Sequence, residues 1–549
     1  MRTLFTLLIC IVALQTHAQA PIVFWNYNIN TPTGRSSNPG GFTNLNGKII
    51  FSAYTDDLGY ELWMTDGSGV QLLKDLSQHS SSPMGFTEYG GKLFFAANDP
   101  NNYGTELWVT DGTSSGTGLF IDINPGHSSS SIGQLINYNG KLYFTATNGT
   151  TNGAGLWVSD GTVAGTQILK NINPINGASA IQNFTAFNGK LYFSANDGTN
   201  GNELWVTDGT AAGTVMVHDI NPGPGNSSPA LFTVAGTEMY FRATTPATGN
   251  ELWKTDGTAA GTVMVKDINP GAGNGYWSSM VSYNGKMYFG GNDGTTGIEL
   301  WETDGTTAGT FMLKELSPGT NGGEPFYFTE YKGKLYFSGK DNGYDRELWC
   351  TDGTAAGTTK VIDLLPGVNG SNPEDFKVYK NHLYFSAQST LGDRQVHRTD
   401  GTAAGTAMFK PAGANHTDPL LTTSGFYLHP NDSTLYFPAY YINGDAAELW
   451  SLKDTTGTST GGGTNINAVA LHDAFSIFPN PNKGVFTLQI DNTNFKNASV
   501  QVCDMAGREV YQSNIAQSVS QIKLNQPAGI YLVKILVDNA VLTKRITIE

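Results

Sequence analysis

Eight aspartates, each followed by glycine, recur at a nearly constant spacing and are the most regular chemical groups in the sequence. They are Asp66, Asp111, Asp160, Asp208, Asp256, Asp304, Asp352 and Asp400. Repeated carboxylates are candidate ligands for calcium, which takes about six to eight oxygen ligands. Each motif offers a single carboxylate, so the sequence favours another role, in which the carboxylate accepts backbone hydrogen bonds and fixes a turn. We therefore expect no cofactor, with calcium as the open alternative.

The histidines do not indicate catalysis. After the first 18 residues they are His79, His127, His218, His382, His397, His416, His429 and His472. None has the His-Glu-x-x-His spacing of a zinc hydrolase, and the sequence has no Gly-x-Ser-x-Gly motif. Carboxylates are numerous, so a glycosidase-like pair of acids stays open as an alternative. The sequence favours a protein that is not an enzyme and predicts no catalytic or metal-binding residue.

A second set of candidates consists of aromatic and arginine side chains in segments that break a repeat. The aromatic residues are Tyr103, Tyr276, Trp277, Tyr344, Tyr440 and Tyr441. Aromatic rings in loops stack on sugars or anchor protein interfaces. Arg346 and Arg394 could pair with carboxylates. We predict that these eight residues bind a ligand; the alternative for each is a surface residue that packs on its own loop.

The repeat that surrounds these residues runs through most of the chain. Glu-Leu-Trp or a variant places tryptophan at 63, 108, 157, 205, 253, 301, 349 and 450, with His397 where one more tryptophan is due. The period of about 48 residues suits four short strands with their turns, and such periods indicate repeat architectures. We expect nine units and assign the tryptophans to packing.

Unit four shows the strands most clearly. They are predicted at 184–187, 191–195, 203–207 and 214–220, and Asn188-Gly189 is a hairpin signal between the first two. The second and third strands are apolar on both faces, which predicts four-stranded sheets stacked on one another. The fold class is therefore all-β: a large β-propeller of nine blades, or eight with an irregular unit, followed by a small C-terminal β-sandwich.

The ends of the repeat predict closure of the ring. The ninth unit lacks a last strand, and residues 22–30 resemble that strand in other units. The N-terminal strand is thus expected to complete the last blade and leave no open edge.

Blade geometry predicts two different faces. The turn after the first strand and the loop after the third hardly change between units, whereas the loops after the second strand and the crossovers between units vary. In an up-and-down blade, the two variable connections share one face. We therefore predict that this face binds the ligand.

The composition and the two ends of the chain indicate where the protein is located and how its domains are divided. With 31 basic and 46 acidic residues the net charge is −15, which argues against nucleic acid as a partner. Residues 1–18 have the features of a signal peptide, and no later segment could span a membrane as a helix. Residues 19–453 form the predicted propeller, 454–473 a flexible linker and 474–549 the sandwich. Cys350 and Cys503 fall in different domains and do not form a disulfide framework.

The C-terminal module resembles a known family. The segments Phe478-Pro479-Asn480-Pro481, Asp504-Met505-Ala506-Gly507-Arg508, Gly529-Ile530-Tyr531-Leu532-Val533 and Lys544-Arg545-Ile546 are similar to the type A sorting domain of the type IX secretion system. This resemblance implies export through that machinery, with residues 474–549 as the contact, followed by release or attachment at the cell surface. Residues 22–453 resemble the ELWxxDGT-repeat proteins of bacterial surfaces, a family that implies no particular activity.

These observations leave three functions open. The leading one is a secreted or cell-surface protein for adhesion or recognition of a glycan or protein, because the aromatic loops gather on the variable face. The second is a secreted carbohydrate-active or other hydrolytic enzyme, which requires carboxylates that converge near the central channel. The third is a structural surface component without a specific ligand.

Overall fold

The computed structural model separates the chain into two compact units. One is Ile22–Asp454, and the other contains Thr455–Glu549. The described residues are 22–27, 29, 36–150, 153–175, 177, 179–276, 278, 280–341, 344–367, 370–388, 394–409, 426–428, 434–440, 447–454, 475–478, 483–490, 498–504, 508–515, 519–527, 529–537 and 540–548. Every regular element among them is a β-strand, so the all-β class is confirmed.

The described part of the first unit forms nine four-stranded antiparallel sheets. We number them in chain order, and eight of them contain four consecutive strands each. Sheets 1 to 4 are β2 (Gly40–Leu45), β3 (Lys48–Thr55), β4 (Gly59–Thr65), β5 (Val70–Lys74); β6 (Met84–Tyr89), β7 (Lys92–Asp99), β8 (Gly104–Thr110), β9 (Gly118–Ile121); β10 (Gly133–Tyr138), β11 (Lys141–Ala146), β12 (Gly155–Ser159), β13 (Gln167–Lys170); and β14 (Gln182–Phe187), β15 (Lys190–Asn196), β16 (Asn202–Thr207), β17 (Val215–His218).

Sheets 5 to 8 follow the same order. They are β18 (Ala230–Ala235), β19 (Glu238–Thr245), β20 (Gly249–Thr255), β21 (Val263–Lys266); β22 (Val281–Tyr283), β23 (Lys286–Asn292), β24 (Ile298–Thr303), β25 (Phe311–Lys314); β26 (Phe326–Tyr331), β27 (Lys334–Asp341), β28 (Asp345–Thr351), β29 (Thr359–Ile362); and β30 (Glu374–Tyr379), β31 (His382–Gln388), β32 (Arg394–Thr399), β33 (Ala407–Phe409). Sheet 9 consists of β34 (Tyr427–Leu428), β35 (Leu435–Tyr440), β36 (Ala447–Asp454) and β1 (Ile22–Tyr27).

The strands predicted for unit four agree with the observed β14 to β17. The central pair is apolar on both faces, as expected: Leu191, Tyr192 and Phe193 of β15 are all buried, and so are Leu204, Trp205 and Val206 of β16. Burial on both faces requires a neighbour on each side, because an isolated sheet would expose one of them.

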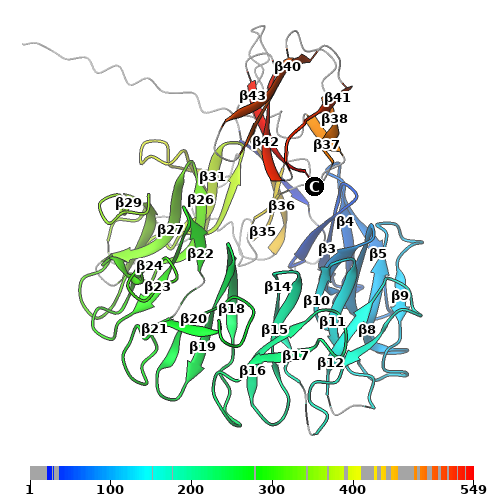
Figure 1. The fold of residues 1–549 in the computed structure, drawn as a ribbon. Helices are drawn as coiled ribbons and strands as arrows, with labels where there is room; N and C mark the ends of the chain where they lie inside the picture. Colours follow the sequence, from blue (N-terminus) through cyan, green and yellow to red (C-terminus); the bar gives the residue numbers. More distant parts are fainter. Residues whose placement is uncertain are drawn as a thin grey trace, which may run out of the picture. The chain divides into compact units, whose positions relative to one another are not determined.

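Each sheet finds those neighbours in the sheets before and after it in the chain. Separate clusters of buried side chains join sheet 1 to sheet 2 and so on through sheet 9. One further cluster joins sheet 9 to sheet 1 through Tyr436, Leu449, Ile49 and Phe51. Figure 1 shows the sheets following one another in sequence order, with first strands such as β14 and β18 on the inner side. The first strands of the sheets are called the inner wall below.

The N-terminal strand pairs with the last sheet, as the sequence predicts. β1 runs antiparallel to β36, with Ile22 opposite Asp454 and Tyr27 opposite Leu449. The contact continues beyond the strand, because Ile29 N donates a hydrogen bond of 3.0 Å to Glu448 Oε2. β36 ends at Asp454, one residue beyond the predicted boundary of this domain.

His397 occupies a tryptophan position. Phe385 lies opposite His397 in the β31–β32 register, as Phe337 lies opposite Trp349 in the sheet before. The Phe385 and His397 rings are 5.4 Å apart and 19° from parallel, against 6.4 Å and 21° for Phe337 and Trp349. His397 is therefore a packing residue in this structure.

The aspartate turns form as predicted. In all eight, Asp Oδ1 accepts a hydrogen bond from the backbone N–H two residues later. In the second unit of the repeat, Thr113 donates both its N–H and its hydroxyl to Asp111. The hydroxyl bond is the main reason that the pKa of Asp111 is lowered.

In seven of the eight turns a glycine five residues after the aspartate leaves room for the carboxylate, which gives a testable pair of substitutions. A Cβ on Gly116 would lie 2.2 Å from the Asp111 carboxylate, whereas a Cβ on Gly118 would meet nothing within 4 Å. We expect Gly116→Ala to lower the free energy of unfolding by about 1–2 kcal/mol, because the carboxylate must leave its turn. Gly118→Ala should change it by less than about 0.5 kcal/mol in the same urea titration; equal effects would contradict this role.

The second unit is a small sandwich. One sheet contains β37 (Phe475–Phe478), β38 (Val485–Ile490) and β41 (Val519–Lys523); the other contains β40 (Glu509–Ile515), β39 (Ala498–Asp504), β42 (Gly529–Val537) and β43 (Ala540–Ile548). Phe486 and Leu488 of the first sheet pack against Val500 and Val533 of the second in one core. Cys350 and Cys503 are both buried and free.

Candidate functional site

The two faces of the first unit are defined by hydrogen bonds between neighbouring sheets. The crossover after sheet 4 contacts the start of β16 and the end of β19. Ser227 N donates to Asn202 O at the start of β16, and Thr244 N near the end of β19 donates to Ser227 O. Crossovers therefore share a face with the loops after the second strands, and we call it the variable face. On the opposite, constant face, the Asn188 side chain donates to the carbonyl of Asp256 in the next sheet.

Buried glutamates accept hydrogen bonds from the crossovers of the variable face, a feature that the sequence analysis did not predict. The glutamates of the Glu-Leu-Trp motifs are almost completely buried: Glu61, Glu106, Glu203, Glu251, Glu299, Glu347 and Glu448. Glu299 accepts hydrogen bonds from the backbone N–H groups of Leu316, Ser317 and Gly323, at 2.6, 3.3 and 3.1 Å. Each glutamate thus ties a crossover to the third strand of its sheet.

Burial raises the pKa of these carboxyl groups, against the opposing effect of the hydrogen bonds. The pKa of Glu61, Glu251 and Glu299 is raised from 4.5 to about 7. The same groups in an unfolded chain would ionise at lower pH, so folding favours their protonated form between these two values. Their regular recurrence indicates a structural role.

The predicted aromatic residues differ in their positions and exposure. Tyr344 is 69% exposed in the loop between β27 and β28, and Tyr103 is half-buried in the loop before β8. Tyr103 follows Asn102 in the chain but is not among the residues that line a nearby polar depression of 580 Å³, which are Asp99, Asn101, Asn102 and residues 75–79. Tyr440 is the last residue of β35, and nothing is described of its side chain. Trp277 and Tyr441 lie outside the described residues.

Tyr276 is not part of the binding surface, so this prediction is corrected. Only 2% of the residue is exposed, and its ring packs edge-to-face on Phe289 at 5.4 Å. The loop residue pairs as an isolated bridge with Gly291 and enters the core between sheets 5 and 6. No sequence pattern distinguishes the two cases, because a tyrosine in a variable segment looks the same whether its side chain points outward or inward.

The hydroxyl of Tyr276 allows a direct test of this placement. It is buried and has no hydrogen-bond partner among the described residues. We expect Tyr276→Phe to leave the free energy of unfolding unchanged or to raise it by about 1 kcal/mol, since an unsatisfied buried hydroxyl costs free energy. Thermal unfolding of the purified variant measures this, and a loss of more than about 1 kcal/mol would show that the hydroxyl has a partner.

The two predicted arginines lie in one pocket between sheets 7 and 8. This pocket, the arginine pocket, has a volume of 380 Å³. It is lined by Phe326, Tyr327, Arg346, Asn372, Pro373, Glu374, Gln388 and Arg394. The arginines are 48 residues apart, and each directly precedes the first residue of a Glu-Leu-Trp-like motif, where the other units have uncharged residues. The sequence repeat therefore places them side by side.

Arg346 is held by its own protein. Its guanidinium donates to the backbone carbonyls of Glu324 and Ser338 and forms an ion pair of 2.7 Å with Glu324. It also lies 5.2 Å from the centre of the Phe326 ring. Burial lowers the pKa of Arg346. With 8% exposed, the residue shapes the wall of the pocket more than it can contact a ligand.

Arg394 is more accessible. Its guanidinium pairs with Glu374 and donates to the carbonyl of Asn372 and the hydroxyl of Ser386. Tyr327, from the neighbouring sheet, donates a hydrogen bond of 3.0 Å to the other oxygen of Glu374. Burial is the main cause of a raised pKa for Tyr327, and this bond adds to it. Tyr327, Glu374 and Arg394 thus form a polar row across two sheets.

Tyr327 occupies a special backbone position that recurs along the inner wall. In seven sheets the second residue of the first strand has a positive φ, between 49° and 70°, beside a bulge in the strand pairing. The residues are Gly41, Gly85, Gln134, Asn183, Leu231, Tyr327 and Asp375. The backbone is repeated there, but the side chains are not, so each sheet presents a different group.

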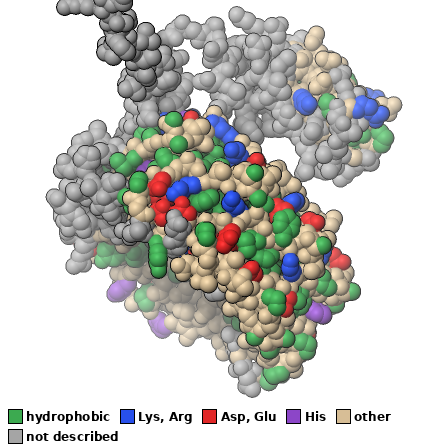
Figure 2. Space-filling model, turned by 90° about the vertical axis from the view of Figure 1, so that its left-hand side faces the viewer, with side chains coloured by type: hydrophobic (Ala, Val, Ile, Leu, Met, Phe, Trp, Pro, Cys, Tyr) green, Lys and Arg blue, Asp and Glu red, His purple; other side chains and the backbone are tan. Residues whose placement is uncertain are grey.

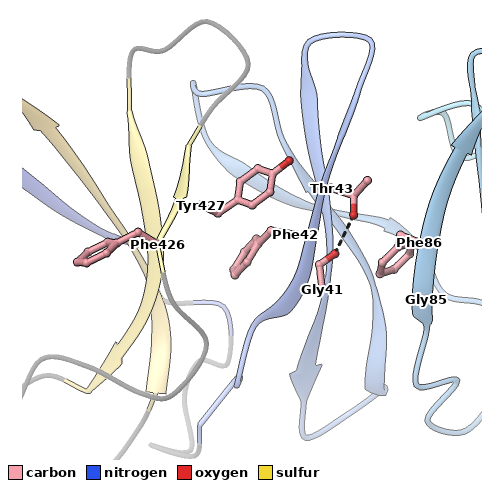
Figure 3. Close-up of a pocket in the computed structure, with 7 residues that line it drawn as sticks. All are labelled: Gly41, Phe42, Thr43, Gly85, Phe86, Phe426 and Tyr427. Carbon is pink, nitrogen blue, oxygen red and sulfur yellow. Dashed lines mark hydrogen bonds between the residues drawn. The ribbon is translucent and has the colours of Figure 1, made fainter. Parts of the chain in front are cut away.

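Where this position is glycine, the inner wall is open. A pocket of 420 Å³ lies beside Gly41 and Gly85 and is lined by Phe42, Phe86, Phe426 and Tyr427. Figure 3 shows these aromatic rings around the glycine backbone, with the Thr43 hydroxyl bonded to the carbonyl of Gly41. The contrast shows that one backbone can present either a gap or a large ring.

One group of acids could hold a cation among the described residues. It consists of Asp345, Glu347 and Asp363, whose ligand atoms lie within 4.8 Å of one another. Lys360 already supplies a positive charge there, with its ammonium 2.8 Å from Asp341 and 3.2 Å from Asp363. In Figure 2, acidic and basic side chains are likewise intermixed on the face in view.

Comparison with known families identifies the C-terminal unit. Residues 476–549 match the family described as the secretion system C-terminal sorting domain. The C-terminal unit is a type IX sorting domain. The sorting domain makes this a secreted or cell-surface protein and implies an interaction with the type IX secretion machinery. The predicted signal peptide lies outside the described residues.

Solved structures offer only distant similarity. PorZ, described as an essential bacterial surface component of the type IX secretion system of Porphyromonas gingivalis, is 12% identical over 93% of this chain and 75% of its own, with a TM-score of 0.35. A puromycin hydrolase is 13% identical over 65% of this chain and 58% of its own, also with a TM-score of 0.35. A DUF3244 protein with an immunoglobulin-like sandwich from Bacteroides vulgatus is 27% identical over 14% of this chain and 84% of its own, with a TM-score of 0.13. These scores are too low to support an assignment.

No curated protein matches the chain in sequence. Among the described residues, no helix has the length and apolar character needed to cross a bilayer.

Proposed function

We propose that this sorting-domain protein is a nine-bladed β-propeller that recognises an extracellular glycan or protein through its variable face. Nine sheets joined in succession by buried clusters, with the last joined to the first, support the propeller. The repeat is consistent with the ELWxxDGT-repeat proteins that residues 22–453 resemble. In such a ring the constant face serves packing, and the variable face is free to carry a specific site.

The arginine pocket is the observation that carries this proposal. The ring repeats its tryptophans, turn aspartates and buried glutamates, yet Tyr327, Glu374 and Arg394 meet at one place on it. A pocket with an aromatic wall and a few convergent polar groups is the usual form of a binding site. Tyr344, strongly exposed in a loop of the same sheet as Tyr327, adds an aromatic group to the same face.

The experiment that tests recognition is an array measurement on the exported, purified protein. We expect selective binding to a small set of glycans or extracellular matrix proteins. Binding should be the same with calcium and with a chelator, because Lys360 supplies the charge at the acidic group. Arg394→Ala should weaken binding, whereas Lys48→Ala on the constant face should not. An array without any selective signal would contradict the proposal and favour a structural surface component.

A hydrolytic activity is the second candidate, and one observation favours it. Glu374 and Asp375 are adjacent carboxylates that the other units lack, and burial together with Glu374 raises the pKa of Asp375. A carboxyl group whose pKa is raised holds its proton to a higher pH, which favours a role as a general acid. If the protein is a hydrolase, array glycans should be cleaved on incubation and Asp375→Asn should abolish cleavage; intact glycans after incubation would exclude this role.

A further inference from the structure

Tyr327 is the most unusual residue of the arginine pocket, because its backbone has a φ of 60°. A left-handed conformation is unfavourable for a large side chain, whereas glycine adopts it freely. Sheets 1 and 2 have Gly41 and Gly85 at the equivalent position. The fold therefore does not require a tyrosine there, and strained residues of this kind gather at functional sites.

The ring of Tyr327 is available to a ligand. The residue is 49% exposed, and its hydroxyl is anchored on Glu374 of the next sheet. An anchored ring beside an open pocket offers a flat apolar surface in a fixed orientation. Such a surface suits the apolar face of a pyranose, because aromatic side chains combine a large contact area with a polar edge.

The charges around the ring favour a neutral ligand. Arg394 is neutralised by Glu374, and Arg346 and Lys340 both lie at Glu324, at 2.7 and 2.5 Å. These five groups are three cations and two carboxylates, so their net charge is only +1. A carboxylate or sulfate ligand would have to compete with glutamates that already hold the arginines. Hydroxyl groups can instead share these donors and acceptors.

The rest of the polar lining has the same character. The Gln388 side-chain oxygen accepts a hydrogen bond from Asn372, and Gln388 lines the pocket with an amide group that can also donate. Glutamate oxygens accept and guanidinium groups donate, so the pocket offers both acceptors and donors beside one aromatic ring. This mixture suits a sugar, because each sugar hydroxyl can both donate and accept.

From this geometry we propose that the arginine pocket is a subsite for a neutral pyranose, which stacks on Tyr327 and exchanges hydrogen bonds with Glu374, Arg394 and Gln388. The proposal rests on the recognition function above and names its ligand class. It assigns Tyr327 as the residue that determines whether a sugar binds.

The test uses Tyr327→Gly in the exported full-length protein. The probes are the methyl glycosides of glucose, galactose, mannose and N-acetylglucosamine, with sialic acid as the anionic comparison, measured by ligand-observed NMR titration. We expect at least one neutral glycoside to bind and Tyr327→Gly to weaken it roughly tenfold or more, which corresponds to about 1.4 kcal/mol per factor of ten. The melting temperature should stay within about 2 °C of the parent, since glycine suits this backbone.

Two further variants separate the contributions. Tyr327→Phe keeps the ring and loses the bond to Glu374, so binding should fall only a few-fold. Leu231→Gly makes the same kind of change at the equivalent left-handed position of sheet 5, outside the pocket, and should leave the titration unchanged. Unchanged binding in Tyr327→Gly, or tighter binding of sialic acid than of every neutral glycoside, would overturn the proposal. If no glycoside binds but the arrays show a protein ligand, the pyranose inference fails and the recognition function stands. If neither the titration nor the arrays show binding, both the inference and the recognition function are overturned.

Discussion

Replacing Glu299 by alanine is expected to lower the free energy of unfolding by about 3–5 kcal/mol. The side chain is completely buried and accepts three backbone hydrogen bonds from the crossover that follows sheet 6. Alanine would leave these N–H groups buried without an acceptor, at about 1–3 kcal/mol each, less what local relaxation recovers. Equilibrium unfolding in urea, followed by tryptophan fluorescence, measures the change.

A matched control is available on the next sheet. Glu330 of β26 is exposed, so Glu330→Ala should change stability by less than about 0.5 kcal/mol. If both variants lost the same stability, or if Glu299→Ala lost less than about 1 kcal/mol, the tie between glutamate and crossover would not contribute as described.

The same glutamates predict how stability depends on pH. Their pKa is raised to about 7 in the folded state, so the folded protein binds more protons than the unfolded chain between about pH 4.5 and pH 7. Stability should therefore fall as the pH rises through this window and stay level above it. Glu299→Gln should flatten the decline. The turn aspartates have the opposite effect, because their pKa is lowered in the folded state. Their contribution to stability is lost as the pH falls below their ordinary pKa of 3.8.

Deletion of residues 22–30 is the second change with a large expected effect. It removes β1, leaves β36 with an unpaired edge and takes Tyr27 and Ile29 from the cluster that joins sheets 9 and 1. Six residue pairs are lost from the ladder, so we expect a loss of about 4–6 kcal/mol at roughly 1 kcal/mol for each hydrogen bond. The melting temperature and the aggregation state of the truncated protein measure it.

A synthetic peptide of residues 22–30 provides the control. Added to the truncated protein, it should bind along β36 and recover much of the lost thermal stability, because an open sheet edge accepts an added strand. A truncated protein that melts like the parent would contradict closure by the N-terminal strand.

The repeat made most of the fold predictable. Side chains that pack between sheets must recur in every sheet, so the tryptophans and the apolar second strands were visible as a period in the sequence. The position of His397 followed from the same count, since the structure stacks it on Phe385 as other sheets stack tryptophan. The unpaired N-terminal segment was recognisable because it resembles the strand that the last unit lacks.

The site was only partly predictable, for two physical reasons. A buried acid such as Glu299 looks like a surface residue in a sequence, although its recurrence beside leucine and tryptophan was a signal that could have revealed it. The direction of a loop side chain depends on backbone geometry that no local pattern reports, so Tyr276 was assigned to the surface while it lies in the core. Tyr327 was missed because its left-handed backbone arises from a bulge.

The most direct test of the account is a crystal structure of the exported protein with a ligand selected on the arrays. The account predicts a closed circle of nine sheets with the ligand on the variable face, between sheets 7 and 8 and against the ring of Tyr327. A ligand bound among the aspartate turns of the constant face, or on the sorting domain, would contradict it.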